Sequence, residues 1–132
     1  IVAPATANTI SKLSHGSSED LASTVILASN KQIFLAPAMN VRMWEHQSTK
    51  NNLKKLISYG YKIIGPVIGD MACGEFGEGK MSDPSEIFSE INIFLFFFDL
   101  IRNYLLYQIF LKDQTFFLHQ ILHKPFRLQQ DQ

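Results

Sequence analysis

The chain has 132 residues, of which 46% are hydrophobic, and its 12 basic side chains balance its 12 acidic ones. This length suits one domain, and a net charge of zero provides no basic surface of the kind that nucleic-acid-binding proteins use. A single cysteine cannot form an internal disulfide, and no basic segment followed by an apolar one opens the chain. We therefore expect a cytoplasmic protein that binds neither nucleic acid nor a membrane.

The first residues have the character of the end of a strand. Residue 1 is not methionine, and Ile1, Val2 and Ala3 form only part of a buried strand of the usual ~5 to 6 residues. We expect a fragment whose fold is incomplete at the N-terminus.

Up to residue 92, short apolar runs alternate with helical stretches, which is typical of a parallel sheet with crossover helices. Strands are predicted at 1–3, 32–36, where Pro37 ends the run, and 62–65. Three helices are predicted before residue 61: one over 6–12, one from about residue 19 through Ile26, and one from Ser48 or Thr49 to Gly60. The side chains expected to face the core from the last two are Leu21, Val25, Ile26, Leu53, Leu56 and Ile57. The predicted fold class is α/β, a Rossmann-like, flavodoxin-type parallel sheet.

Two further segments of this region are predicted from their glycine and proline residues. Residues 69–81 contain four glycines, so we expect a loop there. Pro84, with Asp83 before it and Glu86 after it, marks the start of another helix that continues through Ile91.

From residue 93 to residue 132 the composition changes. Glycine is absent after Gly79, and 8 of the 11 phenylalanines lie in this tail. Residues 91–112 are long enough to span a membrane, but Asp99 and Arg102 lie in the middle, where each charge costs ~2.5 to 3.5 kcal/mol. We expect instead a helix with one aromatic face. A second hypothesis is that the sequence from about Phe94 onward is a frame-shifted or degenerate translation.

Three loops contain the residues best suited to chemistry. Asn8, Asn40 and Cys73 each lie in a Gly- or Pro-containing loop after a short apolar run, the position at which open α/β folds bind ligands. Asn8 either caps the helix that begins beside it or binds a ligand. Asn40 either caps a helix whose Met and Trp residues belong to the core, or fixes a carboxylate beside a planar ring.

Cys73 is interpreted as a functional rather than a structural cysteine, because glycine-rich loops seldom bury a side chain. Glu75 and Lys80 lie in the same loop. His119 and His123 have the spacing of helical metal ligands, but no third ligand accompanies them, so no metal site is predicted.

Together and in this order, residues 3–9, 37–44 and 72–81 resemble three motifs of the homo-oligomeric flavin-containing cysteine decarboxylases. The resemblance is strongest to the members that act on 4'-phosphopantothenoylcysteine in coenzyme A biosynthesis. It covers residues 1–91 and implies FMN as cofactor and a homotrimer or higher homo-oligomer. Lys80 occupies the position at which the family carries arginine, which keeps the charge but loses the planar fork.

The resemblance also implies roles for individual residues. FMN oxidises the thiol of the substrate's cysteine to a thioaldehyde, which then accepts the electrons released with the carboxylate, and the product after reduction is 4'-phosphopantetheine. The implied catalytic residues are Asn40, which orients the carboxylate, and Cys73, which protonates the enethiol. The implied substrate-binding residues are Asn8, Asn40, Met43, Ala72, Gly74 and Lys80, and the implied flavin-binding residues are Pro4, Thr6, Ala7, Asn8 and Met39.

By the resemblance, the family's histidine for the oxidation step would precede residue 1, so this chain alone is expected to be inactive. Three other hypotheses are compatible with the sequence: a non-catalytic flavoprotein subunit, a decayed gene product, and a decarboxylase for peptides that end in cysteine.

Overall fold

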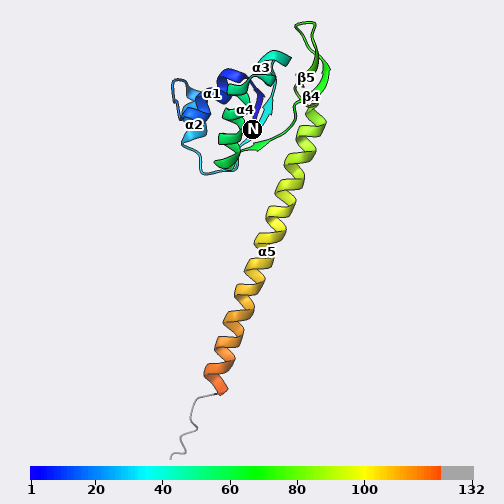
Figure 1. The fold of residues 1–132 in the computed structure, drawn as a ribbon. Helices are drawn as coiled ribbons and strands as arrows, with labels where there is room; N and C mark the ends of the chain where they lie inside the picture. The colour runs from blue at the N-terminus through cyan, green and yellow to red at the C-terminus, as the bar shows by residue number, and fades with distance from the viewer. Residues whose placement is uncertain (123–132) are drawn as a thin grey trace, which may run out of the picture. The chain divides into compact units, whose positions relative to one another are not determined.

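The computed structural model describes residues 1–122, with side chains described as far as Lys112. It divides into two units between Glu90 and Ile91. The elements of the first unit are β1 (Val2–Ala5), α1 (Ala7–His15), α2 (Leu21–Leu27), β2 (Phe34–Pro37), α3 (Val41–Glu45), α4 (Gln47–Ser58), β3 (Lys62–Ile63), β4 (Val67–Asp70) and β5 (Phe76–Lys80) (Figure 1). The helix α5 (Pro84–Leu122) begins in this unit and continues into the second.

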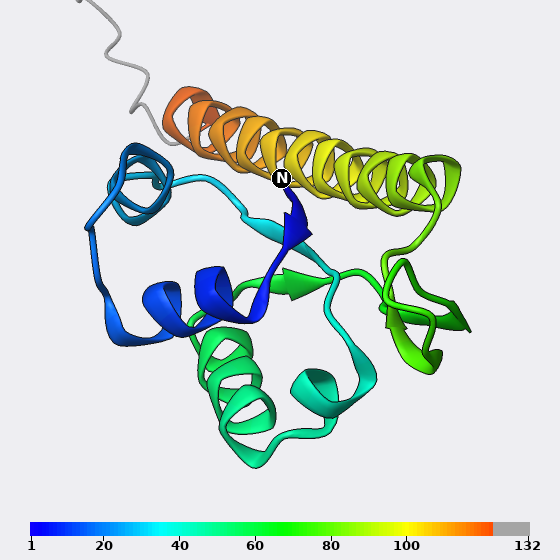
Figure 2. The same cartoon turned by 90° about the horizontal axis from the view of Figure 1, so that it is seen from above.

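The strands β1, β2 and β3 form a parallel sheet in that order, with Leu35 opposite both Val2 and Ile63 (Figure 2). This confirms the predicted α/β class. Pro37 is the last residue of β2, as predicted, because proline has no amide hydrogen to donate to a ladder. The amide of the next residue, Ala38, donates to the carbonyl of Ala5 at 3.1 Å. The carboxyl ends of β1 and β2 therefore lie next to each other.

The core of the first unit is formed by buried apolar side chains from β1, β2, α1, α3 and α4. They are Ala5, Ile10, Leu13, Leu35, Trp44, Leu53 and Leu56. The prediction that Leu53 and Leu56 face the core is confirmed. For Ile57 it is wrong: this side chain is 56% exposed. The buried side of α4 is formed by Thr49, Leu53 and Leu56, and at about 100° per residue Ile57 lies beyond the edge of that side. Trp44 is 6% exposed, and the ammonium of Lys50 lies 3.8 Å from the centre of its ring.

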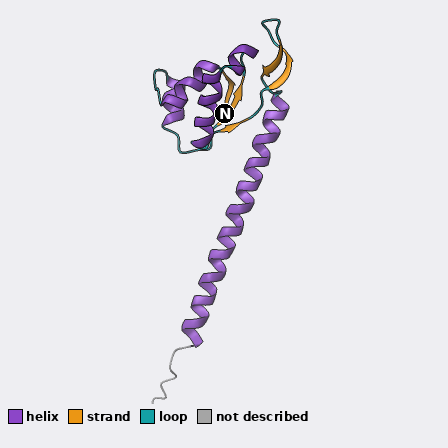
Figure 3. Cartoon of the chain, in the orientation of Figure 1, coloured by secondary structure: helices purple, strands orange, loops and turns teal. Residues whose placement is uncertain are grey.

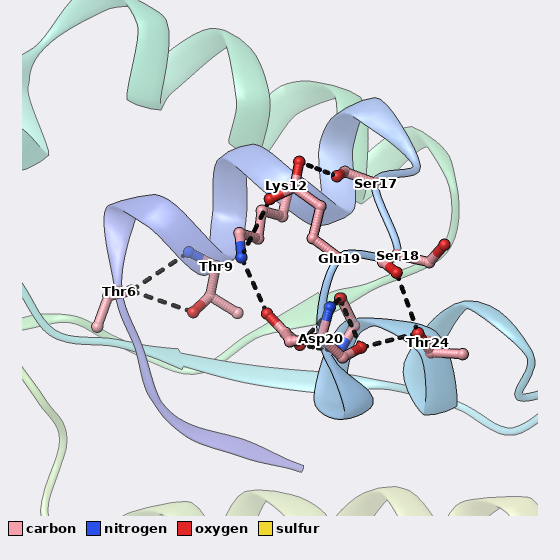
Figure 4. Close-up of polar contacts among 9 residues, drawn as sticks. Thr6, Thr9, Lys12, Ser17, Ser18, Glu19, Asp20 and Thr24 are labelled. Carbon is pink, nitrogen blue, oxygen red and sulfur yellow. Dashed lines mark hydrogen bonds and ion pairs between the residues drawn. The ribbon is translucent and has the colours of Figure 1, made fainter.

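The prediction of a buried apolar face on α2 is also wrong. Leu21 is 80% exposed and Val25 is 59% exposed, while Ile26 packs partly buried against the core. The helix has only seven residues and is held by polar contacts at its start instead. The carboxylate of Asp20 accepts from the amide of Ser23 at 2.7 Å, and the ammonium of Lys12 on α1 lies 2.9 Å from the same carboxylate (Figure 4).

These contacts shift the pKa values of the charged groups between α1 and α2. The hydrogen bond from the backbone of Ser23, followed by the one from Lys12, lowers the pKa of Asp20 from 3.8 to about 2. The hydrogen bond to Asp20 raises the pKa of Lys12. Hydrogen bonds from Ser17 and then Lys12 lower the pKa of Glu19. The contact between α1 and α2 therefore depends on ionised carboxylates.

The ends of the helices are set by capping residues, and one of the predicted caps is wrong. The hydroxyl of Thr6 caps α1 by accepting from the amide of Thr9 at 3.2 Å. The helix α4 begins at Gln47 and is capped by His46, so the prediction of a cap at Ser48 or Thr49 is wrong: the cap lies two residues before Ser48. Gly60, at φ +92°, ends α4 in the left-handed conformation that was predicted. The predicted start of a helix at Pro84 is confirmed.

The prediction of a loop over residues 69–81 is wrong. The strands β4 and β5 form an antiparallel hairpin in which Gly69 pairs with Gly77 and Asp70 pairs with Phe76. Glycine usually interrupts a strand, but here Gly77 and Gly79 adopt φ values of +154° and +149°, extended conformations with positive φ that L side chains rarely adopt.

The described part of the second unit is one helical segment without a break, the continuation of α5 (Figure 3). The expectation of a single aromatic face is wrong, because consecutive residues from Leu95 to Phe98 are all at least half exposed and point to every side of the helix. Among the described residues, Pro84–Lys112 is the one helix long and apolar enough to cross a membrane by length and composition.

We expect the amides of Ser23 and Thr24 to lose protection from hydrogen exchange as the pH falls from 4 to 2. The pKa of Asp20 is lower in the fold than its ordinary 3.8, so its contribution to stability is complete above that value and disappears as the pH falls through about 2. Hydrogen exchange followed by NMR, with the amides of Leu53 and Leu56 in α4 as internal references, measures this. Asp20→Asn should abolish the pH dependence at α2, and Asp70→Asn should not. An unchanged pH dependence in Asp20→Asn would contradict the assignment.

Candidate active site

Two hydrogen bonds attach the β4–β5 hairpin to the segment that connects β2 with α3. The amide of Met39 donates to the carbonyl of Gly79 at 3.0 Å. The amide of Val41, the first residue of α3, donates to the carboxylate of Glu75 at 3.3 Å. The hairpin that carries Cys73 is thereby fixed beside the loop that carries Asn40.

Two glycines make this close approach possible. A Cβ atom on Gly79 would overlap the carbonyl oxygen of Met39 and lie 2.8 Å from the Cε of Met71. A Cβ atom on Gly77 would lie 2.8 Å from the Cγ2 of Val41. Real Cβ atoms essentially never come so near to a neighbour, so β5 can lie against residues 39–41 only because it has glycine at both positions.

A cavity of about 470 Å³ lies between the hairpin and this loop. Its lining is mostly apolar and comprises Ala38, Met39, Asn40, Asp70, Met71, Ala72, Cys73, Gly79, Lys80 and Met81. Five residues predicted for the site from sequence thus meet here from distant parts of the chain: Met39, Asn40, Ala72, Cys73 and Lys80. Cys73 is exposed, which excludes the buried structural alternative for this cysteine. We call this cavity the thiol cavity.

Asn40 caps a helix with the oxygen of its side-chain amide and leaves the nitrogen of that amide available to a ligand. Its Oδ1 accepts from the amide of Met43 at 2.8 Å, which caps α3. Its Nδ2 has no hydrogen-bond partner among residues 1–112. The capping and ligand-binding interpretations of Asn40 are therefore compatible, since each uses a different atom.

A second cavity of about 390 Å³ lies on the other side of Asn40. It is lined by Ala7, Ser11, Asn40, Arg42, Met43, His46, Ser48, Thr49 and Asn52. Asn40, a site residue predicted from the sequence, lines both cavities and lies at the boundary between them.

Four predicted site residues line neither of these two cavities: Pro4, Thr6, Asn8 and Gly74. Thr6 is engaged as the cap of α1. The capping interpretation of Asn8 is therefore wrong, and its exposed side chain has no hydrogen-bond partner within residues 1–112. Gly74 forms the turn of the hairpin at φ +82°, and its amide donates to the carbonyl of Met71 at 2.9 Å.

Sequence reasoning missed several lining residues. Asp70, Met71 and Met81 line the thiol cavity, and Arg42 and His46 line the second one. Asp70 and Met71 directly precede the motif that contains Cys73, and Arg42 is two positions beyond Asn40. Their nearness to predicted site residues in the sequence could have identified them as lining residues. No group of three metal-ligating side chains occurs among the described residues, and the side chains of His119 and His123 lie outside them.

The chain matches the Flavoprotein family over residues 1–95. It is 48% identical over 94 residues to the Coenzyme A biosynthesis bifunctional protein CoaBC of Haemophilus influenzae, a match that covers 71% of this chain and 24% of that protein. It is 38% identical over 96 residues to the phosphopantothenoylcysteine decarboxylase of Arabidopsis thaliana, with 71% and 46% covered. The chain therefore spans about a quarter to a half of the length of these relatives.

Solved structures are similar over the same region. A mutant PPC decarboxylase complexed with pantothenoylaminoethenethiol superposes with a TM-score of 0.69 at 37% identity, which covers 70% of this chain and 52% of that one. The FMN-binding protein AtHal3 superposes with a TM-score of 0.63 at 38% identity, with 70% and 51% covered.

Together, the parallel sheet, the two cavities at the carboxyl ends of its strands and these similarities define an α/β domain with the fold of the flavoprotein decarboxylases. The chain belongs to the Flavoprotein family, whose members include FMN-dependent cysteine decarboxylases and phosphopantothenoylcysteine decarboxylases.

The residues present fit a planar cofactor such as FMN. Ala7 and Asn8 lie in the first turn of α1 after β1, and Met39 and Asn40 follow β2, so small, apolar and amide side chains gather where two parallel strands end. Such a strand edge is where open α/β sheets bind nucleotide cofactors. The side-chain amide of Asn8 and the Nδ2 of Asn40 provide hydrogen-bond donors at that edge.

We expect Gly79→Ala to reduce the free energy of unfolding by about 1 to 3 kcal/mol and to detach the hairpin, because the added methyl group would meet the Met39 carbonyl at a strained φ. Urea denaturation measures the loss. Gly74→Ala is the matched control: it also has positive φ, but a Cβ there meets nothing within 4 Å. Equal losses of stability in the two variants would show that the positive φ alone causes the loss at Gly79, and that the close approach to Met39 does not contribute.

Proposed function

We propose that this domain takes part in the FMN-dependent decarboxylation of 4'-phosphopantothenoylcysteine to 4'-phosphopantetheine. The observation that carries the proposal is that Asn40 and Cys73 line one cavity beside the edge of the sheet suited to a flavin. The similarity to bacterial CoaBC and plant phosphopantothenoylcysteine decarboxylases supports this choice of substrate. When bound, FMN would supply the oxidation of the substrate thiol and the return of the same two electrons.

Asn40 is suited to hold the carboxylate that is lost. Because its Oδ1 is fixed by the hydrogen bond from the Met43 amide, the direction of its Nδ2 is fixed as well. That nitrogen can donate to a carboxylate oxygen without first losing another partner. A donor whose orientation is set by the fold holds the substrate in a reactive geometry at little entropic cost.

Cys73 is suited to deliver a proton after decarboxylation. It lies in the turn between β4 and β5, is exposed, and lines the same cavity as Asn40. Its S–H can therefore approach a substrate held by the Asn40 amide. The ammonium of Lys80 in this lining provides a positive charge for the substrate carboxylate or phosphate, although without the fork of an arginine.

The remaining binding contacts are assigned around the same edge. Met43 and the amide of Asn8 would contact the substrate, together with the backbone of Ala72 and Gly74 in the hairpin turn. Pro4, Thr6, Ala7 and Met39 would contact the flavin. Because the chain spans about half of its plant relatives, we expect turnover to need the rest of a relative-length protein, assembled as a homotrimer or larger oligomer.

The proposal is tested with this chain and with the chain extended by its upstream coding region, each supplied with FMN and 4'-phosphopantothenoylcysteine. The extended protein should bind flavin, release carbon dioxide and form 4'-phosphopantetheine. Flavin binding without carbon dioxide would favour the non-catalytic flavoprotein subunit instead. If neither protein binds flavin, the proposed function is wrong.

We expect Asn40→Asp to lower the rate of carbon dioxide release about 100-fold, because the carboxylate keeps the cap of α3 but cannot donate to another carboxylate. Circular dichroism should show an unchanged fold. Asn30→Asp, in an exposed loop, is the matched control and should keep full activity. An active Asn40→Asp protein would reduce Asn40 to a helix cap.

Cys73→Ser should separate the two halves of the reaction. Carbon dioxide release should continue, since Asn40 and the flavin site are intact, while 4'-phosphopantetheine formation should fall by about 100-fold because the hydroxyl is a poorer proton donor. Mass spectrometry of the products measures both. Equal loss of carbon dioxide and product would contradict a role for Cys73 after decarboxylation.

A further inference from the structure

The segment of α5 between Glu90 and Lys112 presents apolar side chains on every side. Six consecutive residues, 93–98, are all apolar, and at about 100° per residue they occupy the whole circumference of the helix. Phe96, Phe97 and Phe98 are 67%, 55% and 57% exposed, and no residue from 88 to 112 is buried. An uncovered apolar surface of this extent in water is unfavourable, so the segment requires an apolar environment around it.

The length of this segment matches the hydrocarbon thickness of a membrane. Roughly 20 residues separate the charged side chains of Glu90 and Lys112, which corresponds to about 30 Å at the rise of an α-helix. A bilayer has a hydrocarbon core of about 30 Å, and a helix satisfies all of its backbone hydrogen bonds internally. We propose that residues 91–111 of α5 span a lipid bilayer.

An ion pair lowers the cost of placing the two charged residues of this segment inside a membrane. Asp99 and Arg102 were expected to exclude the segment from a membrane, but the Nη2 of Arg102 lies 3.0 Å from the Oδ1 of Asp99. They are one helical turn apart, so the pair forms within the helix itself. Pairing with an opposite charge is one of the ways in which ionisable residues are accommodated inside membranes, because each charge replaces part of the hydration that the other has lost.

A second copy of the helix is a poorer occupant than lipid. A two-stranded coiled coil buries a narrow seam of about two residues in seven and leaves the opposite side in water. Here the polar side chains of Asn92, Asp99 and Asn103 lie along one line of the helix, Arg102 and Gln108 lie off that line, and apolar side chains occur on every side. Lipid contacts all sides at once, whereas one partner helix would leave most of the phenylalanines exposed.

The proposal replaces the expectation that the protein binds no membrane. It is independent of flavin binding and decarboxylation, because it concerns residues 91–111 and its test measures neither flavin nor turnover. It also applies to the chain whatever the origin of this part of its sequence.

The test is flotation of the purified full chain with vesicles of neutral phosphatidylcholine, followed by extraction with alkaline carbonate. Neutral lipid removes electrostatic binding as a cause. We expect the chain to float with the vesicles and to resist extraction, as integral proteins do. Protein that sediments without floating is aggregated, and protein that carbonate releases is peripheral; either result would overturn the proposal.

The chain offers a matched pair of variants. Ile101 in α5 and Ile57 in α4 are 58% and 56% exposed, so arginine at either position disturbs no packed core. Ile101→Arg should lower the partition coefficient into vesicles about 100-fold, because it adds an unpaired charge at the middle of the span. Ile57→Arg should leave partitioning unchanged.

Two further results would contradict the proposal. The first is the same partitioning for both variants, which would show that α5 does not enter the lipid. The second is a soluble oligomer of defined size, measured by sedimentation without lipid, in which residues 91–112 resist proteolysis. That oligomer would identify a second copy of the chain as the cover of α5.

Discussion

The arrangement of the site depends on the close approach of β5 to residues 39–41. The hairpin has little apolar burial of its own, since Ile68 and Phe76 are 69% and 71% exposed. Its position is set by the hydrogen bond from Met39 to Gly79 and by the absence of side chains at Gly77 and Gly79. Because hydrogen bonds and close backbone contact with residues 39–41, rather than a hydrophobic core, hold the hairpin in place, Cys73 in its turn stays exposed.

The sequence allowed the site to be predicted better than the hairpin that supports it. Spacing and residue type placed Asn40, Cys73 and Lys80 in loops after strands, and these residues do line one cavity. The hairpin was missed because glycine was taken only as a breaker, whereas at φ near +150° it continues a strand that other residues could not. Thr6 and Asn8 are both good caps, and only the backbone decides which one begins the helix.

Apolar periodicity predicted which residues share a helix face but not how much of that face is covered. It identified Leu53 and Leu56 correctly because α4 packs against α1 and these two side chains join the core cluster there. It failed for Leu21 and Val25, since α2 is short and its capping and ion pairs replace apolar contact. For α5, composition predicted a helix, but the position of each side chain around the axis was needed to see that exposed apolar side chains lie on every side of it.

The single tryptophan of the chain has an optical consequence. Trp44 lies in α3, the helix that Asn40 caps, and its ring is enclosed by the core and the Lys50 ammonium. Its fluorescence therefore arises from one place, within a few residues of both cavities. Flavins absorb light at the wavelengths at which an enclosed indole emits, so a flavin seated beside Asn40 would quench that emission by energy transfer. The fold thus contains a built-in spectroscopic reporter of cofactor occupancy that needs neither label nor substrate.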